Sequence, residues 1–263
     1  MTAPYRAAIT GLGAYLPERI LTNADIEKMV ETTDEWIRTR TGIRERHIAA
    51  KEQATSDLAL PAAQEALKNA GITPQDLDLI IVATTSPDMI FPSASCYLQA
   101  KLGASCGAFD LAAACSGFAY ALSVAEGFVK SGIYKNVLVV GAETISRFIN
   151  WKDRGTCVLF GDGAGAAVVS RSKDGHGILA SYLGADGKQS EILQIPAGGS
   201  RIPPTAESVA LGQHYIRMDG PALFKIAVKT MEQAVLKVLE QEKLQVKDIA
   251  CLIPHQANNR ILQ

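Results

Sequence analysis

The sequence has almost no net charge, no long apolar segment and no export signal, and each absence excludes a class of protein. Its 26 basic and 27 acidic side chains leave a net charge of -1, so electrostatics give no reason to expect nucleic acid or an anionic membrane as a partner. No uninterrupted apolar segment is long enough to cross a bilayer, and the N-terminus lacks the basic region of a signal peptide. We therefore expect a globular cytoplasmic protein.

Cysteine is scarce, and its spacing argues against structural roles. The five cysteines are an odd number, and none forms a C-x-x-C pair. Disulfide frameworks and zinc sites normally show such pairing. We therefore expect free thiols in a reducing compartment, and no metal or other cofactor.

A nucleotide-binding loop is also missing. The stretch Gly161-Asp-Gly-Ala-Gly165 is rich in glycine, but no Lys-Ser or Lys-Thr follows it. It leads into the apolar residues 166–169, which read as a strand, whereas a dinucleotide fingerprint leads into a helix. The stretch therefore predicts a tight turn with close backbone packing.

Apolar runs alternate with amphipathic helices along most of the chain, which indicates an α/β layered fold. We expect strands at 7–15, 77–84, 109–113 and 136–141, and an edge strand at 177–184. We expect helices at 24–30, 34–41, 56–70, 93–102, 116–130 and 218–242, and a surface loop at 197–208. The helix at 56–70 should bury one face made of Leu58, Ala59, Ala62, Ala63, Ala66 and Leu67.

One segment of the sequence recurs 172 residues later. Residues 66–85 and 238–257 both read as the end of a long helix, a short linker with an aspartate (Asp76 and Asp248), and an apolar strand. This predicts two similar halves, at 1–172 and 173–263. In that register the counterpart of Cys115 would fall beyond Gln263, so we expect the second half to be incomplete in this chain.

Cys115 is the first candidate for chemistry. It ends the apolar run Asp110-Leu-Ala-Ala-Ala and is followed by Ser-Gly and a helix pattern, as in a nucleophile carried on a sharp strand-to-helix turn. A helix N-terminus would lower the pKa of its thiol. A small buried thiol packed between alanines explains the pattern equally well.

His255 and Trp36 are the other candidates. Among the four histidines, only His255 follows an apolar strand, at 251–253, and precedes a helix, which is where ligands gather in α/β sheets. A helix-capping or core histidine is an equally good interpretation. Trp36 lies next to charged residues and could stack on a base, or simply close the edge of a core.

Five motifs occur together and in order: D-E-W-I-x-T-R-T-G-I-x-E-R (34–46), A-C-S-G-F (114–118), D-R-G-T (153–156), F-G-D-G-A-G-A-A-V (160–168) and P-H-Q-A-N-x-R-I (254–261). As a set they closely resemble the β-ketoacyl-acyl carrier protein synthase III family, the initiating condensing enzymes of bacterial type II fatty acid synthesis. The resemblance extends over residues 6–263. It implies a thiolase-like α/β fold, with five α-β-α-β-α layers built from two similar halves, and a homodimer.

The resemblance implies an acyltransferase reaction. Cys115 would take an acyl group from an acyl-CoA primer, and malonyl-acyl carrier protein would lose carbon dioxide and attack the resulting thioester. His255 matches a donor that stabilises the thioester oxygen during decarboxylation. The family's second donor, an asparagine, and its C-terminal glycine-rich segment have no match among these 263 residues.

The resemblance also assigns binding residues. It places Trp36 and Arg154 about the adenine of CoA, with Arg40 and Thr41 nearby. The pantetheine tunnel and active site match Gly220, Phe224 and Asn259. The basic entrance, where the acidic carrier protein docks, matches Lys225 and Arg260. Phe91 matches the residue that reaches across the dimer into the partner's acyl pocket, and its bulk favours a short primer such as acetyl-CoA.

Three alternatives remain open at this stage. A related thiolase-fold ketosynthase of secondary metabolism would carry the same cysteine and histidine. A cysteine hydrolase would use Cys115 and His255 as a nucleophile and its base, and would release a free acid. A catalytically incomplete fragment would only bind or pair.

Overall fold

The computed structural model describes residues 5–262, which form two compact units. The first unit contains residues 5–19, 47–145 and 161–181, and the second contains residues 20–46, 146–160 and 182–262. These units differ from the predicted halves at 1–172 and 173–263, which describe an internal duplication of the sequence. The division into halves stays a prediction.

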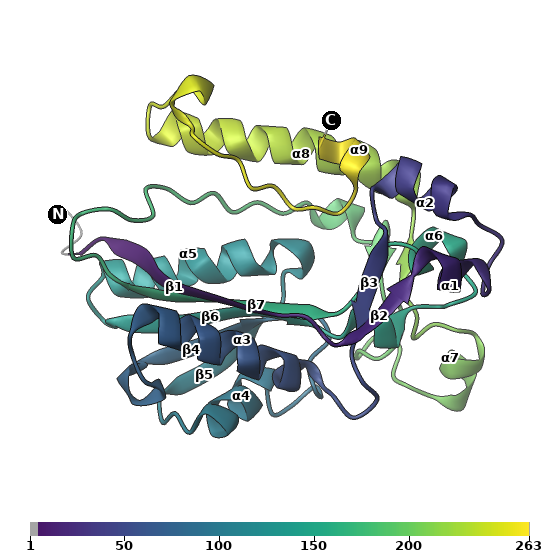
Figure 1. The fold of residues 1–263 in the computed structure, drawn as a ribbon, viewed down its shortest axis with the longest axis horizontal. Helices are drawn as coiled ribbons and strands as arrows, with labels where there is room; N and C mark the ends of the chain where they lie inside the picture. Colours follow the sequence, from purple (N-terminus) through teal and green to yellow (C-terminus); the bar gives the residue numbers. More distant parts are fainter. Residues whose placement is uncertain (1–4, 263) are drawn as a thin grey trace. The chain divides into compact units, whose positions relative to one another are not determined.

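A five-stranded sheet forms the centre of the first unit (Figure 1). Its order is β1 (Ala7–Tyr15), β7 (Gly163–Arg171), β6 (Asn136–Glu143), β4 (Leu79–Ala83) and β5 (Gly107–Leu111). Strand β4 runs parallel to β5 and β6, whereas β7 is antiparallel to both of its neighbours. Helices α3 (Thr55–Ala70) and α4 (Ala94–Leu102) cover one face, and α5 (Gly117–Lys130) covers the other.

The continuous apolar run at 77–84 becomes β4 because both faces of this strand are covered. All five of its residues are buried. Ile80 and Val82 belong to the core under α3 and α4, and Leu79, Ile81 and Ala83 to the core under α5. Alternation of side chains along a strand distributes these residues between the two cores. The predicted helix at 56–70 is also confirmed, and the six residues expected on its inner face are all buried.

Glycine allows β1 to lie directly on α3. A Cβ placed at Gly11 would be 2.2 Å from the carbonyl oxygen of Ala66, and one at Gly13 would be 2.1 Å from that of Ala62. No side chain fits at either distance, so the strand approaches the helix backbone only because both positions are glycine.

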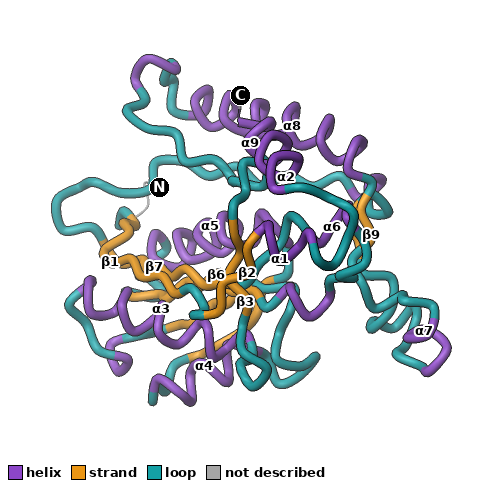
Figure 2. Tube along the Cα trace, turned by 45° about the vertical axis from the view of Figure 1, so that its right-hand side comes forward, coloured by secondary structure: helices purple, strands orange, loops and turns teal. Residues whose placement is uncertain are grey.

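The remaining elements are short, apart from one long helix (Figure 2). The helices are α1 (Asn23–Glu27), α2 (Asp34–Thr41), α6 (Arg154–Cys157), α7 (Ala206–Ala210), α8 (Gly220–Gln241) and α9 (Asn259–Leu262). Two two-stranded sheets pair β2 (Arg19–Thr22) with β3 (Glu45–Ile48) and β8 (Leu193–Gln194) with β9 (Arg217–Met218). The 3-10 turns in the described part of the chain are η1 (Pro74–Asp76), η2 (Ala114–Ser116), η3 (Ile145–Phe148), η4 (Gly187–Gln189) and η5 (Val246–Asp248). Within residues 5–262, no helix is both long and apolar enough to span a membrane.

The repeated segment is reproduced in backbone geometry. Helices α3 and α8 are each followed by a left-handed residue, Gly71 at φ 68° and Lys243 at φ 57°. Each is then followed by a 3-10 turn whose aspartate accepts a hydrogen bond from the backbone N–H three residues earlier, at 2.8 Å for Asp76 and 2.9 Å for Asp248. The helix end and linker of the repeat are therefore confirmed at both places.

Three predicted elements are wrong. Residues 177–184 form no strand, because the N–H of Ile178 makes one backbone bond to Ala7, at 2.8 Å, and no ladder follows it. Residues 251–253 also form no strand: Leu252 is 62% and Ile253 86% exposed, and no described strand lies beside them to pair with. The loop at 197–208 ends early, because Thr205 caps α7.

Candidate active site

The turn that carries Cys115 is sharper than the sequence pattern predicts. Strand β5 ends at Leu111, two residues before the predicted end at 113, and η2 follows before α5 begins at Gly117. Ala114 has φ 45°, a left-handed conformation that costs energy in a residue with a side chain. Such strain gathers at functional sites. The turn leaves Cys115 exposed to solvent.

Two glycines let this turn lie against the sheet. A Cβ at Gly117 would be 3.1 Å from that of Ala83 in β4, and a Cβ at Gly141 of β6 would be 3.2 Å from the ring of Phe118. Ala83 pairs with Leu111 on one side and Gly141 on the other, so the three parallel strands end at one edge. Cys115 therefore lies at the carboxyl ends of β4, β5 and β6, the usual place for ligands in such sheets.

Glu143, which the sequence analysis missed, ties together the ends of β4 and β6. Its carboxylate accepts hydrogen bonds from the backbone N–H of Thr85 at 2.8 Å, from the Thr85 hydroxyl at 3.0 Å, and from the Ser86 hydroxyl. The Ser86 hydroxyl also accepts the N–H of Thr144 at 2.8 Å. A charged residue directly after the apolar run 137–142 was the signal that could have found it.

The thiol of Cys115 is not acidified in this environment. Although part of its surface is open to solvent, the atoms packed around the thiol desolvate it and raise its pKa, and the nearby carboxylate of Glu143 raises the pKa further. This is the opposite of the lowering expected from a helix N-terminus. At neutral pH the thiol therefore keeps its proton, and a nucleophilic attack needs a base to accept it.

His255 belongs to the second unit, whereas Cys115 belongs to the first. It lies in an irregular segment seven residues after the end of η5, and α9 begins at Asn259. Its imidazole is exposed, but partial desolvation lowers its pKa, so the ring is neutral at pH 7. A neutral imidazole can donate one hydrogen bond and accept another.

Within the second unit, two cations lie against the indole of Trp36. The guanidinium carbon of Arg40 lies 4.8 Å from the ring centre, and that of Arg154 lies 4.9 Å from it. Helix α2 supplies Trp36 and Arg40, since Thr33 caps its start and Gly42 ends it with φ 81°. Asp153 caps the short helix α6 that carries Arg154. The structure thus brings Arg154 to two residues of α2 that lie more than 100 positions earlier in the sequence.

Thr41 has a different environment. Its side chain is buried, and its hydroxyl donates to the carbonyl of Ile37 at 2.7 Å and accepts from the N–H of Ile43 at 3.0 Å. In this structure the hydroxyl therefore stabilises the end of α2, and its proposed place near CoA stays a prediction.

The other predicted binding residues lie on α8 and α9. Arg260 lies with its guanidinium carbon 5.8 Å from the centre of the Phe224 ring. Asn259 packs on the end of α2, where a Cβ built on Gly42 would lie 2.9 Å from the Cβ of Asn259. Gly220 is the first residue of α8, and Lys225 is exposed one turn further on. Five of the predicted residues therefore lie on two helices of one unit.

Phe91 lies in the loop between β4 and α4 of the first unit. Its side chain is 82% exposed, as is that of Ile90. Exposure of two adjacent large apolar side chains is unfavourable in an isolated chain. Phe91 therefore points away from the core of its own unit.

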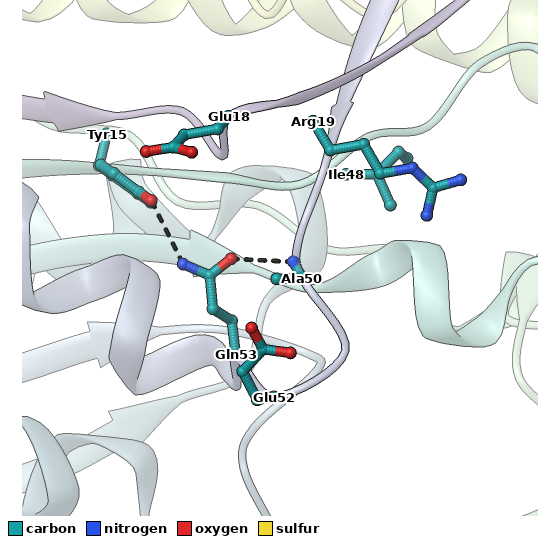
Figure 3. Close-up of a pocket in the computed structure, with 7 residues that line it drawn as sticks. All are labelled: Tyr15, Glu18, Arg19, Ile48, Ala50, Glu52 and Gln53. Atoms are coloured by element: carbon teal, nitrogen blue, oxygen red, sulfur yellow. Dashed lines mark hydrogen bonds between the residues drawn. The ribbon is translucent and has the colours of Figure 1, made fainter.

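A separate surface pocket of about 490 Å³ lies where β1 ends and α3 approaches (Figure 3). The amide of Gln53 spans it, donating to the hydroxyl of Tyr15 at 3.2 Å and accepting from the N–H of Ala50 at 2.9 Å. Glu18 and Glu52 also line it. None of the predicted site residues lines this pocket, and its hydrogen bonds join two segments of the first unit.

Comparison with known proteins settles the family. The family model for 3-oxoacyl-[acyl-carrier-protein] synthase III matches residues 109–187, which include the Cys115 turn. A β-ketoacyl-[acyl-carrier-protein] synthase III of Caldanaerobacter subterraneus subsp. tengcongensis is 60% identical over 258 residues, covering 98% of this chain and 78% of the relative. The chain belongs to the β-ketoacyl-[acyl-carrier-protein] synthase III family. This confirms the resemblance seen in the motifs.

Solved structures of condensing enzymes share the fold of this synthase III chain. The 3-oxoacyl-[acyl-carrier-protein] synthase III of Aquifex aeolicus VF5 superposes with a TM-score of 0.88 at 50% identity, over 97% of this chain and 78% of that one. The priming β-ketosynthase of the R1128 polyketide pathway gives 0.90 at 36% identity, over 100% and 78%. The thiolase-like α/β fold is therefore confirmed, and the family is one of condensing acyltransferases.

Proposed function

We propose that this chain starts fatty acid synthesis by condensing a short acyl-CoA with malonyl-acyl carrier protein. The Cys115 sulfur attacks the acyl-CoA thioester carbonyl, an acyl-cysteine thioester forms, and CoA leaves as its thiol. Malonyl-acyl carrier protein then loses carbon dioxide, and its carbanion attacks that thioester. The products are 3-oxoacyl-acyl carrier protein and the Cys115 thiolate, and the cycle needs no cofactor. The observation that carries the proposal is the strained, exposed Cys115 turn at the edge of three parallel strands.

His255 is assigned the second half of this cycle. Decarboxylation moves negative charge onto the malonyl thioester oxygen, and a neutral imidazole can donate a hydrogen bond to it. The lowered pKa of His255 keeps the ring in that form at pH 7. His255→Ala should therefore suppress decarboxylation more than it suppresses acylation of Cys115.

Acylation is tested with labelled acetyl-CoA and malonyl-acyl carrier protein. We expect label on Cys115 and formation of 3-oxobutyryl-acyl carrier protein, and neither with Cys115→Ser. Cys251→Ser is the matched control, because Cys251 is also an exposed thiol. Release of free acetate would support the cysteine hydrolase instead, and no transfer at all would support a catalytically incomplete chain.

Trp36, Arg40 and Arg154 are proposed to hold the adenine and phosphates of CoA. An indole offers a face to a purine, and the two guanidinium groups suit phosphates. Trp36→Ala should raise the KM for acyl-CoA by about 3- to 10-fold, since stacking contributes about 0.5–1.5 kcal/mol. Arg40→Ala should act in the same direction, and Arg38→Ala should not, because Arg38 pairs with Asp34 on the same helix at 3.4 Å.

Lys225 and Arg260 are proposed to dock the acidic carrier protein. Both are exposed cations, and Arg260 is held beside α8 by its contact with Phe224. Lys225→Glu should raise the KM for malonyl-acyl carrier protein and leave that for acyl-CoA unchanged. Lys243→Glu, at the far end of α8, is the control for general charge effects.

A homodimer is proposed from the β5 edge of the sheet, one of its two edges. Among the described strands β5 has a neighbour on one side only, and its Phe109 is 37% exposed. Proteins seldom leave such an edge uncovered, and pairing with a second copy would continue the ladder. Sedimentation should show a dimer that Phe109→Lys weakens. In that dimer Phe91 is proposed to close the partner's acyl pocket, so Phe91→Thr should improve longer primers over acetyl-CoA.

A ketosynthase of secondary metabolism is the second candidate, favoured by the likeness to the R1128 priming enzyme. Its identity of 36% is lower than the 60% and 50% of the synthase III relatives from Caldanaerobacter and Aquifex, so it is the second candidate. Competition between fatty acid and polyketide carrier proteins would decide between the two. A cytoplasmic location is part of the proposal.

A further inference from the structure

The loop that carries Phe91 is fixed at its base and exposed at its tip. Met89, Ile90 and Phe91 form the tip, and they are 46%, 82% and 82% exposed. These side chains are not stabilised by packing in the core of their own unit. The residues on either side of the tip must therefore set the direction in which the side chains point. We define residues 84–93, between β4 and α4, as the Phe91 loop.

The first half of the Phe91 loop is held by a charged cluster. The carboxylate of Asp88 accepts from the N–H of Ser56 at 3.1 Å and from its hydroxyl at 2.6 Å. Lys101 of α4 donates to the same hydroxyl at 2.6 Å and to Asp57 at 2.6 Å. Lys101 thereby joins α4 to the start of α3, and Asp88 fixes the Phe91 loop to the same Ser56. We call Asp88, Ser56 and Lys101 the clamp.

The second half of the loop is held from the sheet. Asp110 of β5 accepts the N–H groups of Ala94 and Ser95, both at 2.8 Å, and so fixes the start of α4. The hydroxyl of Tyr97 donates to the sulfur of Met89 at 3.2 Å. Hydrogen bonds to α3, β5 and α4 therefore anchor the chain on both sides of the exposed tip.

The clamp explains how an exposed phenylalanine could discriminate between acyl primers of different chain length. Under the proposed function, Phe91 closes an acyl pocket and excludes long primers. A side chain on a mobile loop would yield to a longer chain, because binding a few more methylene groups would repay its displacement. A side chain on an anchored loop would not yield. Charge-assisted bonds such as those of Asp88 are among the stronger contacts a surface loop can make.

We propose that the clamp of Asp88, Ser56 and Lys101 sets the primer-length selectivity of the enzyme by holding Phe91 in place. The proposal rests on the proposed function of Phe91. Asp88 is a positioning residue in this scheme, since it touches neither substrate nor Cys115. Loss of the clamp relaxes selectivity and leaves acylation by acetyl-CoA intact.

The test measures kcat/KM for acetyl-CoA and hexanoyl-CoA in Asp88→Ala. The selectivity ratio, kcat/KM for acetyl-CoA divided by kcat/KM for hexanoyl-CoA, should fall by roughly tenfold or more. A change of this size is typical of discrimination by pocket shape. Ser56→Thr should keep the wild-type ratio, because threonine retains the hydroxyl and the N–H. Lys101→Met should give an intermediate ratio, and it carries the same test if Asp88→Ala does not fold.

Asp76→Ala is the matched control. Its carboxylate accepts the N–H and hydroxyl of Thr73, both at 2.8 Å, which is the same pattern of bonds on a turn away from the Phe91 loop. A merely structural effect of losing such bonds would lower stability in both variants and change the ratio in neither. Hydrogen exchange in residues 86–93 should rise in Asp88→Ala and not in Asp76→Ala.

A double variant tests whether the clamp acts through Phe91. Phe91→Thr alone should lower the ratio, and adding Asp88→Ala to it should lower it no further. An unchanged ratio in Asp88→Ala, or additive effects in the double variant, would overturn the proposal while leaving the role of Phe91 intact. No effect of Phe91→Thr would overturn both roles, and the Cys115 label would still report acyl transfer separately.

Discussion

Asp110 should be among the most sensitive surface-accessible positions of the first unit, because it caps a helix that cannot cap itself. Ser93 is the N-cap residue of α4, but its hydroxyl bonds to the Ser95 hydroxyl at 2.7 Å and makes no bond to a helix N–H. The carboxylate of Asp110 takes over this role from the neighbouring strand, with one oxygen on each of two N–H groups at 2.8 Å. Asp110→Ala leaves both N–H groups without that acceptor.

The cost follows from those two bonds. A typical intramolecular hydrogen bond contributes about 1 kcal/mol, and one to a charged group contributes about 1.5–3 kcal/mol. The site is half-buried, so water replaces part of each bond. Two bonds at the lower end of the charged range give about 2–3 kcal/mol for Asp110→Ala. Asp110→Asn keeps one acceptor oxygen and loses the charge at the helix start, so it should cost about half as much.

Urea unfolding measures this cost, provided that the probe sees the correct unit. Both tryptophans, Trp36 and Trp151, lie in the second unit, so their fluorescence does not report on α4 directly. Far-UV circular dichroism includes α3, α4 and α5 of the first unit. Asp174→Ala is the control, because its carboxylate accepts the N–H of His176 at 3.1 Å in an exposed turn, where water can substitute. A loss below about 0.5 kcal/mol for Asp110→Ala, or an equal loss for Asp174→Ala, would refute the reasoning.

Three further outcomes follow from the same structure. Gly13→Ala should destabilise the chain by about 3 kcal/mol or more in urea, since its Cβ would lie 2.1 Å from a carbonyl oxygen of α3; Gly165→Ala, with no atom within 4 Å of the new Cβ, should stay near wild type. Alkylation of Cys115 followed by mass spectrometry should show a raised pKa that Glu143→Gln lowers, because removing a negative neighbour favours the thiolate; an unchanged midpoint would contradict this. In an NMR titration, His255 should lose its proton at a lower pH than free histidine. Because the folded state binds this proton less readily than the unfolded state, the chain should lose stability as pH falls through the pKa of the unfolded histidine. A titration midpoint above that of free histidine would exclude the desolvation argument.

Periodicity alone predicted the parts of the fold whose stabilising contacts recur along one element. The inner face of α3 is one example, because six small or apolar residues at helical spacing can be buried only on one side. Strand β4 is another, since a run that is apolar throughout must be covered on both faces. The motif set, rather than the periodicity, predicted that Trp36 and Arg154 belong to one site. The structure places the Arg154 guanidinium 4.9 Å from the indole ring.

Contacts between elements were the part that sequence reasoning could not supply. Asp110 was noticed only as the start of the cysteine motif, and its bonds to α4 depend on the register of β5 beside that helix. The sign of the Cys115 pKa shift was wrong for the same reason. A helix N-terminus can be recognised in the sequence, whereas the desolvation that raises the pKa of Cys115, and the smaller effect of the nearby Glu143 carboxylate, depend on how the strands and helices pack.

The segment that recurs after 172 residues shows which structural features depend on nearby residues and which depend on distant ones. The left-handed residue and the capped 3-10 turn form after both α3 and α8, because every hydrogen bond involved lies within a few residues. The apolar run that follows forms a strand only at 79–83, where β5 and β6 flank it, and remains irregular and exposed at 251–253. Two runs of comparable apolar character therefore differ in structure because, within residues 5–262, only one has strands beside it to bond its backbone. Nearby residues determine the turn, whereas the strand forms only with hydrogen-bond partners from the rest of the sheet.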